Sequence, residues 1–336
     1  MVRKSLLIAA LLAVAAPLAA QQDEAVWTSK RPDGHAPLGV LGDRTLDRGQ
    51  VAVSYRFTQL DSKGIWFQSD SLGLEQTLEF YPVAPLSMSN VLHEVVVEYA
   101  PTSNFTLMAN VGYTQRHREQ YTTDGVYYAT DSDNLGDLEV RGLYNVFRTG
   151  RTVAHISLGA LIPTGKTDIT GQTRNGQGPL PYDMRPGGGT FGVLPGITLQ
   201  SQNDKATVGL QMRGTIRFGE NDLGYTVGNV YESSGWAAYR LNDFFAVTAR
   251  AHFVKWNGID GADPGLDPTE DPGNDGYFSS GRRLDLPLGL NLRMPEGSRF
   301  AGHNLSVEWI FPVSQKYDGP QLGADWGVVA GWQVVF

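Results

Sequence analysis

The stretch ATVGLQMRGTIRF at Ala206–Phe218 decides the fold. Its even-numbered positions carry Ala, Val, Leu, Met, Gly, Ile and Phe, whereas its odd-numbered positions carry Thr, Gly, Gln and Arg. Successive side chains of a strand point to opposite faces, so this alternation predicts a strand that separates an apolar environment from a polar one. The same period recurs at 105–113, 138–146, 284–292, 305–311 and 326–336.

The alternating segments add up to twelve predicted strands. Tight turns, such as those near 101–103, 148–151 and 201–204, alternate with long polar segments near 59–88, 117–136, 164–188, 258–280 and 314–324. The predicted strands lie near 50–58, 89–100, 104–116, 137–148, 152–163, 189–200, 205–218, 223–240, 243–257, 281–294, 300–313 and 325–336.

An even strand count, with short turns on one side and long loops on the other, is the plan of an outer-membrane barrel. In lipid every backbone N–H and C=O must be paired, so a sheet can span a membrane only when it closes on itself. We therefore predict an all-β, antiparallel, up-and-down transmembrane β-barrel. A large secreted β-sandwich is the alternative, although its connections need not alternate in length.

The N-terminal residues have the features of a secretory signal peptide. Arg3 and Lys4 precede an apolar run at 5–16, and small residues follow up to Ala20. This run is shorter than the roughly 20 residues of a spanning helix. We predict a signal peptide at 1–20, a Pro/Gly-rich segment at 21–48 that lies in the periplasm or partly plugs the pore, and the barrel at 49–336.

The composition excludes several classes of protein. The 336 residues include no cysteine, which rules out disulfides, thiol nucleophiles and a lipid-bearing cysteine. A net charge of −8 and a pI near 5.3 disfavour nucleic-acid binding. Export without a lipid anchor predicts a Gram-negative outer-membrane protein, which we expect to be a monomer without a cofactor.

The last strand carries a predicted assembly signal. The stretch GWQVVF ends in an aromatic residue, and its Gly331, Val334 and Phe336 fit the pattern by which the barrel-assembly machinery recognises a terminal strand. Seven aromatic residues fall toward strand ends, where amphipathic rings favour the membrane interface. They are Tyr99, Tyr113, Tyr144, Trp236, Trp309, Trp326 and Trp332.

The polar faces of the strands define a predicted lumen that is richer in arginine than in carboxylates. Two interpretations are open: the arginines pair with carboxylates and fill a narrow barrel, or they form a ladder that draws anionic solutes inward. The residues assigned to the lumen and the solute path are Arg56, Glu98, Arg116, Glu139, Arg141, Arg213, Arg217, Arg250, Arg283, Asp285, Arg293 and Glu308.

An acidic loop near 257–276 is a weak candidate for calcium binding. Asp260, Asp263, Asp267 and Asp271 lie among glycines and prolines, and Ca²⁺ takes six to eight oxygen ligands. The spacing is not that of an EF-hand. A solvated acidic loop is the alternative, and no metal site is otherwise expected.

Several short motifs occur along the predicted barrel: GDL at 136–138, GALIPTGK at 159–166, GRRLDLPLGLN at 281–291, PVSQ at 312–315 and GPQL at 319–322. Together they resemble the outer-membrane transporters associated with the meta-pathway of phenol degradation. The resemblance implies a barrel that takes up small, often aromatic, compounds.

Three functions compete for such a barrel. A channel that admits small solutes is our prediction, and a structural or adhesive barrel is the first alternative. A lipid hydrolase would need Ser, His and an orienting Asn or Asp close together, for which His93 with Ser87 or Ser89 is the candidate. The expected partners are outer-membrane lipid and a small-molecule solute.

Overall fold

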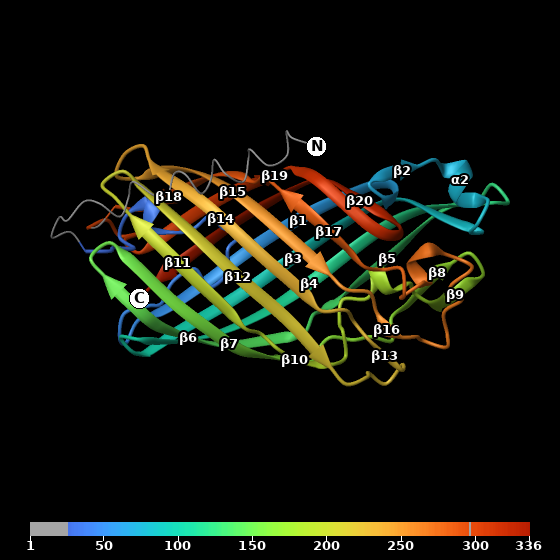
Figure 1. Cartoon of the computed structure of the whole chain (residues 1–336), viewed down its shortest axis with the longest axis horizontal. Helices are drawn as coiled ribbons and strands as arrows, with labels where there is room; N and C mark the ends of the chain where they lie inside the picture. Colours follow the sequence, from blue (N-terminus) through green and yellow to red (C-terminus); the bar gives the residue numbers. More distant parts are fainter. Residues whose placement is uncertain (1–25, 296) are drawn as a thin grey trace.

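The computed structural model describes residues 26–295 and 297–336, and these form a closed antiparallel β-barrel of twelve strands (Figure 1). The predicted signal peptide lies outside the described residues. β1 (Val51–Gln68) pairs on one side with β3 (Val83–Thr102) and on the other with β20 (Pro312–Val335), and this last pairing closes the barrel. In the part of the chain described, no helix is long and apolar enough to cross a membrane.

The rest of the wall follows the chain from neighbour to neighbour, as the sequence predicted. Four wall strands are built from two consecutive pieces. The wall comprises β4 (Phe105–Thr122), β5 (Tyr127–Leu135) with β6 (Leu138–Thr149), β7 (Thr152–Ile162), β10 (Phe191–Val193) with β11 (Gly196–Gln202), β12 (Ala206–Phe218), β14 (Val230–Arg240), β15 (Phe245–Trp256), β17 (Gly281–Asp285) with β18 (Leu288–Arg293), and β19 (His303–Ile310) with the start of β20.

The small elements lie in the connections. The three-residue 3₁₀ helix η2 (Pro32–Gly34) precedes the first strand, and the others lie at the long-loop end of the barrel. They are β2 (Asp70–Leu72), α2 (Leu74–Leu78), β8 (Thr170–Thr173), β9 (Gly176–Pro179), η3 (Tyr182–Met184), β13 (Tyr225–Thr226), β16 (Asp260–Gly261) and η4 (Pro272–Asn274).

Several strands continue into regions that the sequence assigned to loops. β1 extends to Gln68, β4 and β5 fill most of 117–136, and β20 runs through 314–324. These extensions pair with one another beyond the apolar band, for instance Tyr121 opposite Tyr127. Both faces of the β4–β5 ribbon are polar: His117 and Asp131 lie on the exposed face, and Arg118 and Thr130 on the buried one. Its sequence therefore lacks the apolar–polar alternation that marks a spanning strand.

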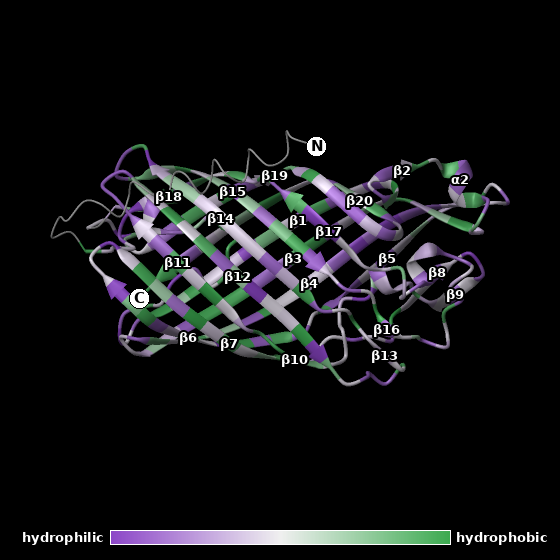
Figure 2. Ribbon diagram, viewed as in Figure 1, coloured by the Kyte–Doolittle hydropathy of each residue, from purple (hydrophilic) through white to green (hydrophobic). Residues whose placement is uncertain are grey.

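Within the band the alternation matches the predicted faces. On β12 the outward side chains of Leu210 and Met212 are 52% and 63% exposed, whereas the inward Thr207 and Gln211 are 0% and 7% exposed. Figure 2 shows the same alternation along the neighbouring strands of the wall. An apolar outer surface around a polar interior is the arrangement of a lipid-embedded barrel rather than of a sandwich with an apolar core.

Candidate functional site

The polar interior of the barrel is the candidate site, and the predicted lumenal residues lie on its inward strand faces. Most are engaged in ion pairs, as the pair-filled interpretation expects. The measured N···O distances are 2.8 Å for Arg56–Glu94, 3.1 Å for Arg141–Glu139, 3.1 Å for Arg250–Glu308, 2.7 Å for Arg213–Glu232 and 2.8 Å for Arg283–Asp285.

Part of this charge forms a continuous network across adjacent strands. His252 on β15 lies 3.4 Å from a carboxylate oxygen of Glu232 and 3.4 Å from one of Asp285. At the two ends of this row of side chains, Arg213 pairs with Glu232 and Arg283 pairs with Asp285. Glu232 is missing from the predicted lumenal residues because the predicted strand at 223–240 has no assigned inward face. Counting alternate positions back from Ser234 would include it.

Two predicted lumenal arginines are not neutralised in this way. Among the described residues, Arg116 on β4 and Arg217 on β12 have no carboxylate oxygen within 4.0 Å. Arg116 donates instead to the carbonyl oxygen of Asp183 at 2.8 Å, and Arg217 to that of Gly228 at 3.1 Å. Two arginines therefore fit the ladder interpretation, whereas most of the others fit the paired one.

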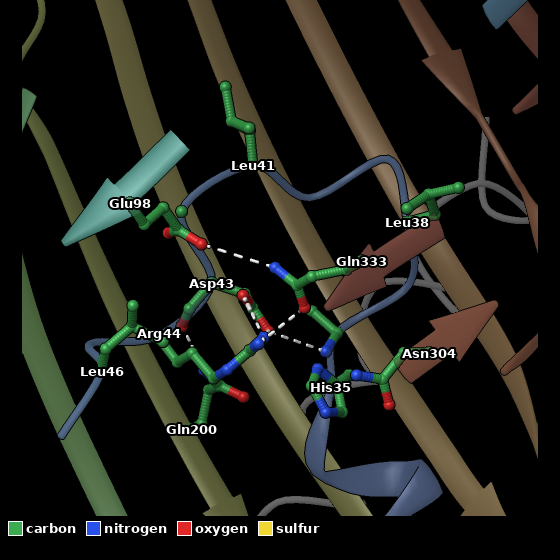
Figure 3. Close-up of polar contacts among 12 residues, drawn as sticks. His35, Leu38, Leu41, Asp43, Arg44, Leu46, Glu98, Gln200, Asn304 and Gln333 are labelled. Atoms are coloured by element: carbon green, nitrogen blue, oxygen red, sulfur yellow. Dashed lines mark hydrogen bonds and ion pairs between the residues drawn. The ribbon is translucent and has the colours of Figure 1, made fainter. Parts of the chain in front are cut away.

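In the N-terminal segment, residues 26–50, the middle part at 32–46 lies inside the short-turn end of the barrel, and the two ends lie at its rim. This segment passes the ends of β11 and β18, reaches Arg56 and Glu308, and returns past β7, β12 and β20 to the start of β1 (Figures 1 and 3). Its wall contacts include Thr28–Gln202 at 3.2 Å, His35–Asn291 at 3.1 Å, Leu38–Arg56 at 3.1 Å, Leu41–Gln211 at 3.0 Å, Gly42–His155 at 3.1 Å, Arg44–Gln333 at 2.7 Å and Leu46–Thr106 at 2.9 Å.

The remaining predicted lumenal residues also contact this segment or its anchors. Arg293 lies 3.3 Å from a ring nitrogen of His35, and Glu98 accepts a hydrogen bond from Gln333 at 3.4 Å. Figure 3 shows Gln333 between Glu98 and Arg44, so that one wall amide joins the segment to the barrel.

Two glycines, one in the N-terminal segment and one in β20, allow the segment to approach the wall closely. A Cβ at Gly39 would lie 2.0 Å from Arg250 Nη2 and 2.7 Å from Glu308 Oε2. A Cβ at Gly331 would lie 2.9 Å from Leu38 Cδ2. Gly331, predicted as part of the assembly signal, thus also makes room for the N-terminal segment. Phe336 pairs with Val51 through backbone hydrogen bonds at the closing seam.

Apolar contacts also hold the N-terminal segment in place, and one of them shows that the predicted position of Trp236 is wrong. Trp236, placed in the membrane girdle by the sequence analysis, is 2% exposed and packs inside the barrel against Ala36 and Val40. The reason is its partner strand: Gly209 leaves the space that the indole ring fills. Other girdle residues, including Tyr99, Tyr144, Trp309 and Trp326, are exposed on the outer wall.

At the opposite end, two long loops fold over the mouth and are tied to the wall by buried charges. Arg118 on β4 is fully buried between Asp183 at 3.2 Å and Asp271 at 2.6 Å. Arg185 pairs with Asp263 at 2.7 Å and lies over the rings of Tyr182 and Tyr225. Burial raises the pKa of the Asp271 carboxyl, and the neighbouring Arg118 opposes that change.

The aspartates of the calcium hypothesis have other contacts in this structure. The carboxylates of Asp263 and Asp271 are taken by arginines, and that of Asp267 accepts from the backbone and hydroxyl of Thr269. Within residues 26–295 and 297–336, no group of three or more His, Cys, Asp or Glu is placed to hold a metal ion. Asp260 belongs to the short strand β16 instead.

The Arg118 tie makes a testable prediction about the outer loops. Arg118→Gln leaves Asp271 buried without its cation, so the loop at 257–280 is expected to open more often and to be cut several times faster by proteinase K. Arg174→Gln breaks an exposed pair with Asp124 and serves as the matched control. Equal cleavage rates for the two variants would contradict the proposed tie.

The candidate hydrolase residues do not form a catalytic arrangement. His93 faces outward, and its Nδ1 lies 2.7 Å from the hydroxyl of Tyr55. Ser89 is four residues along β3, or about 13 Å in a strand, and its hydroxyl donates to Asp61. Ser87 donates to Glu119. Neither serine is within hydrogen-bond reach of the imidazole.

Comparison with known proteins places the fold but not the family. No family model matches the sequence, and no curated protein matches it. An outer-membrane channel from Pseudomonas putida F1 is similar with a TM-score of 0.59 and 10% identity, over 88% of this chain and 99% of that chain. The chain therefore has the fold of an outer-membrane β-barrel. Its resemblance to the phenol meta-pathway family stays a prediction.

Two further solved structures are more distant. The translocator domain of the autotransporter NalP from Neisseria meningitidis has a TM-score of 0.44 at 15% identity, covering 87% of this chain and 90% of that one. The monoaromatic hydrocarbon channel CymD has a TM-score of 0.41 at 10% identity, covering 93% and 97%.

Proposed function

We propose that the protein is a bacterial outer-membrane channel that admits small solutes, with anionic and aromatic compounds among them. The observation that carries the proposal is the closed wall itself, apolar outside and lined inside by arginines and carboxylates. A barrel of twelve strands is wider than the eight-stranded barrels that side chains fill and narrower than an open porin. Its interior can therefore pass small molecules only.

The N-terminal segment would set the width of this path. It occupies the short-turn end, whereas cavities of about 260 and 370 Å³ lie below the outer loops. The arginines on both sides of the constriction would favour anions over cations, since fixed positive charge in a narrow passage attracts the opposite sign.

Conductance of the refolded protein in a planar bilayer tests the proposal. We expect small steps that prefer anions, and we expect Arg213→Ala with Arg217→Ala to lower the anion preference at least about twofold, because two fixed charges leave the path. The matched control is Arg151→Ala with Arg240→Ala, which removes the same charge at the short turns.

Failure of this experiment has a definite meaning. A heat-modifiable barrel that never conducts, even after residues 26–46 are deleted, would exclude an open channel and favour a structural or adhesive barrel. If the protein conducts but Arg213→Ala with Arg217→Ala leaves its anion preference unchanged, the protein is a channel whose selectivity does not depend on these two arginines.

A further inference from the structure

The geometry points to a binding site for a small organic carboxylate beneath the outer loops, held by Arg116 and Arg217; as a substrate site it rests on the channel function proposed above. The two side chains come from strands separated in the wall by β6, β7 and β10, and they border one cavity of about 260 Å³. Its other lining residues include Tyr182, Arg185, Tyr225 and residues 186–188.

The charge balance of this cavity favours an anion. Its lining residues include three arginines, Arg116, Arg185 and Arg217, and one acidic residue, Asp183. Arg185 is paired with Asp263, and Arg118 is shared between Asp183 and Asp271. Arg116 and Arg217 are the arginines of this lining that have no carboxylate oxygen within 4.0 Å among the described residues.

The two guanidinium groups also have hydrogen-bond donors to spare. Arg116 uses Nη1 for the carbonyl of Asp183 and makes a long 3.4 Å contact from Nε to Asn90. The buried Nε of Arg217 has no hydrogen-bond partner among the described residues. A guanidinium offers five N–H donors in a planar fork that matches a carboxylate, so both groups can still bind one.

The nearby acidic side chain does not occupy this position. The carboxylate of Asp137 accepts from the backbone N–H groups of Gly165 and Gly188 at 3.1 and 3.0 Å. It thereby fixes the loop that forms one wall of the cavity. An external carboxylate would supply the direct ion pair that Arg217 lacks among the described residues.

A second cavity explains why the ligand should carry an apolar body. It measures about 370 Å³ and shares Tyr182, Asp183, Val227 and Ile259 with the first. Its other lining residues include Met88, Val230, Trp256, Tyr317 and Leu322. Together the two cavities provide a charged end and an apolar end, as in sites that orient a small molecule by a few polar groups.

Calorimetric titration of the full-length mature protein in detergent tests this site. Cyclohexanecarboxylate is the probe, and its isosteric amide, cyclohexanecarboxamide, removes the charge at constant shape. We expect the carboxylate to bind at least about tenfold more tightly than the amide and than acetate. Arg116→Gln with Arg217→Gln should weaken carboxylate binding at least about tenfold, since two charge-assisted hydrogen-bond donors are lost.

The matched control is Arg151→Gln with Arg240→Gln, which makes the same charge change at the short turns and should leave the affinity unchanged. Heat modifiability on a gel verifies that each variant forms the barrel. Equal affinity of the native protein and the Arg116/Arg217 variant, or equal affinity for carboxylate and amide, would overturn the inference. Carboxylate binding by a barrel that does not conduct would refute only the channel, whereas conduction without this binding would refute only the site.

Discussion

Deletion of residues 26–46 is expected to raise the single-channel conductance at least about twofold, since the bare lumen of a twelve-stranded barrel is wider than the side-chain-filled interior of an eight-stranded one. The segment lies across the short-turn end and is held by side chains from strands on all sides of the wall. Its removal leaves β1 and the closing seam with β20 intact. Planar-bilayer recordings of the shortened and full chains measure the difference.

A single substitution should produce part of the same effect. Gly39→Val introduces a side chain where even a Cβ would meet Arg250 and Glu308, so the segment must move from its seat. Gly73→Val is the control, because a Cβ there lies no closer than 3.5 Å to any neighbour. Unchanged conductance in both the deletion and Gly39→Val would show that residues 26–50 do not limit the path.

Arg250→Met is expected to destabilise the folded barrel by about 3–5 kcal/mol, the cost of leaving one charge of a buried pair alone. The side chains of Arg250 and Glu308 are 4% and 1% exposed, and Glu308 also accepts the backbone N–H of Gly39. The pair thus joins β15, β19 and the N-terminal segment. Urea unfolding of the refolded protein in lipid vesicles, followed by tryptophan fluorescence, gives the change in free energy.

The double substitution distinguishes a buried pair from a hydrated one. Arg250→Met with Glu308→Leu should cost less than either single change, because no isolated charge remains in the interior. Arg151→Met removes the partner of an exposed carboxylate, Asp204, and should cost less than about 1 kcal/mol. If Arg250→Met cost no more than Arg151→Met, the lumen would have to be well hydrated at this point.

The sequence predicts the barrel because its deciding signal is local. On β12, each outward Leu or Met between inward Thr, Gln and Arg reflects lipid on one side and a polar interior on the other. The same rule fails where both faces of a strand are polar, and so it missed β5 and the continuation of β20. Trp236 shows a different limit, because its inward position depends on Gly209 of the neighbouring strand.

The inward faces could be predicted, but the partners within the lumen could not. Alternation places Arg116 and Arg250 on the same inward surface, yet Arg116 lacks a carboxylate partner and Arg250 is paired with Glu308, two strands away in the wall. Such pairings depend on strand register and on loops that fold inward from distant parts of the chain. The path of residues 26–50 is likewise set by contacts spread over the whole wall, none of which leaves a periodic signal.

The position of the N-terminal segment constrains the order in which the molecule can be assembled. The segment leads directly into β1, and two of its seats, Gly331 for Leu38 and Gln333 for Arg44, belong to the very last strand. It cannot be fully bound until that strand is in place. Both ends of the segment lie at the short-turn rim, where Trp27 bonds to Gly150 and Gly49 to Ala100. The pairing of β20 with β1 therefore comes before the final binding of the segment or together with it, so the first described residues of the chain are among the last to reach their place.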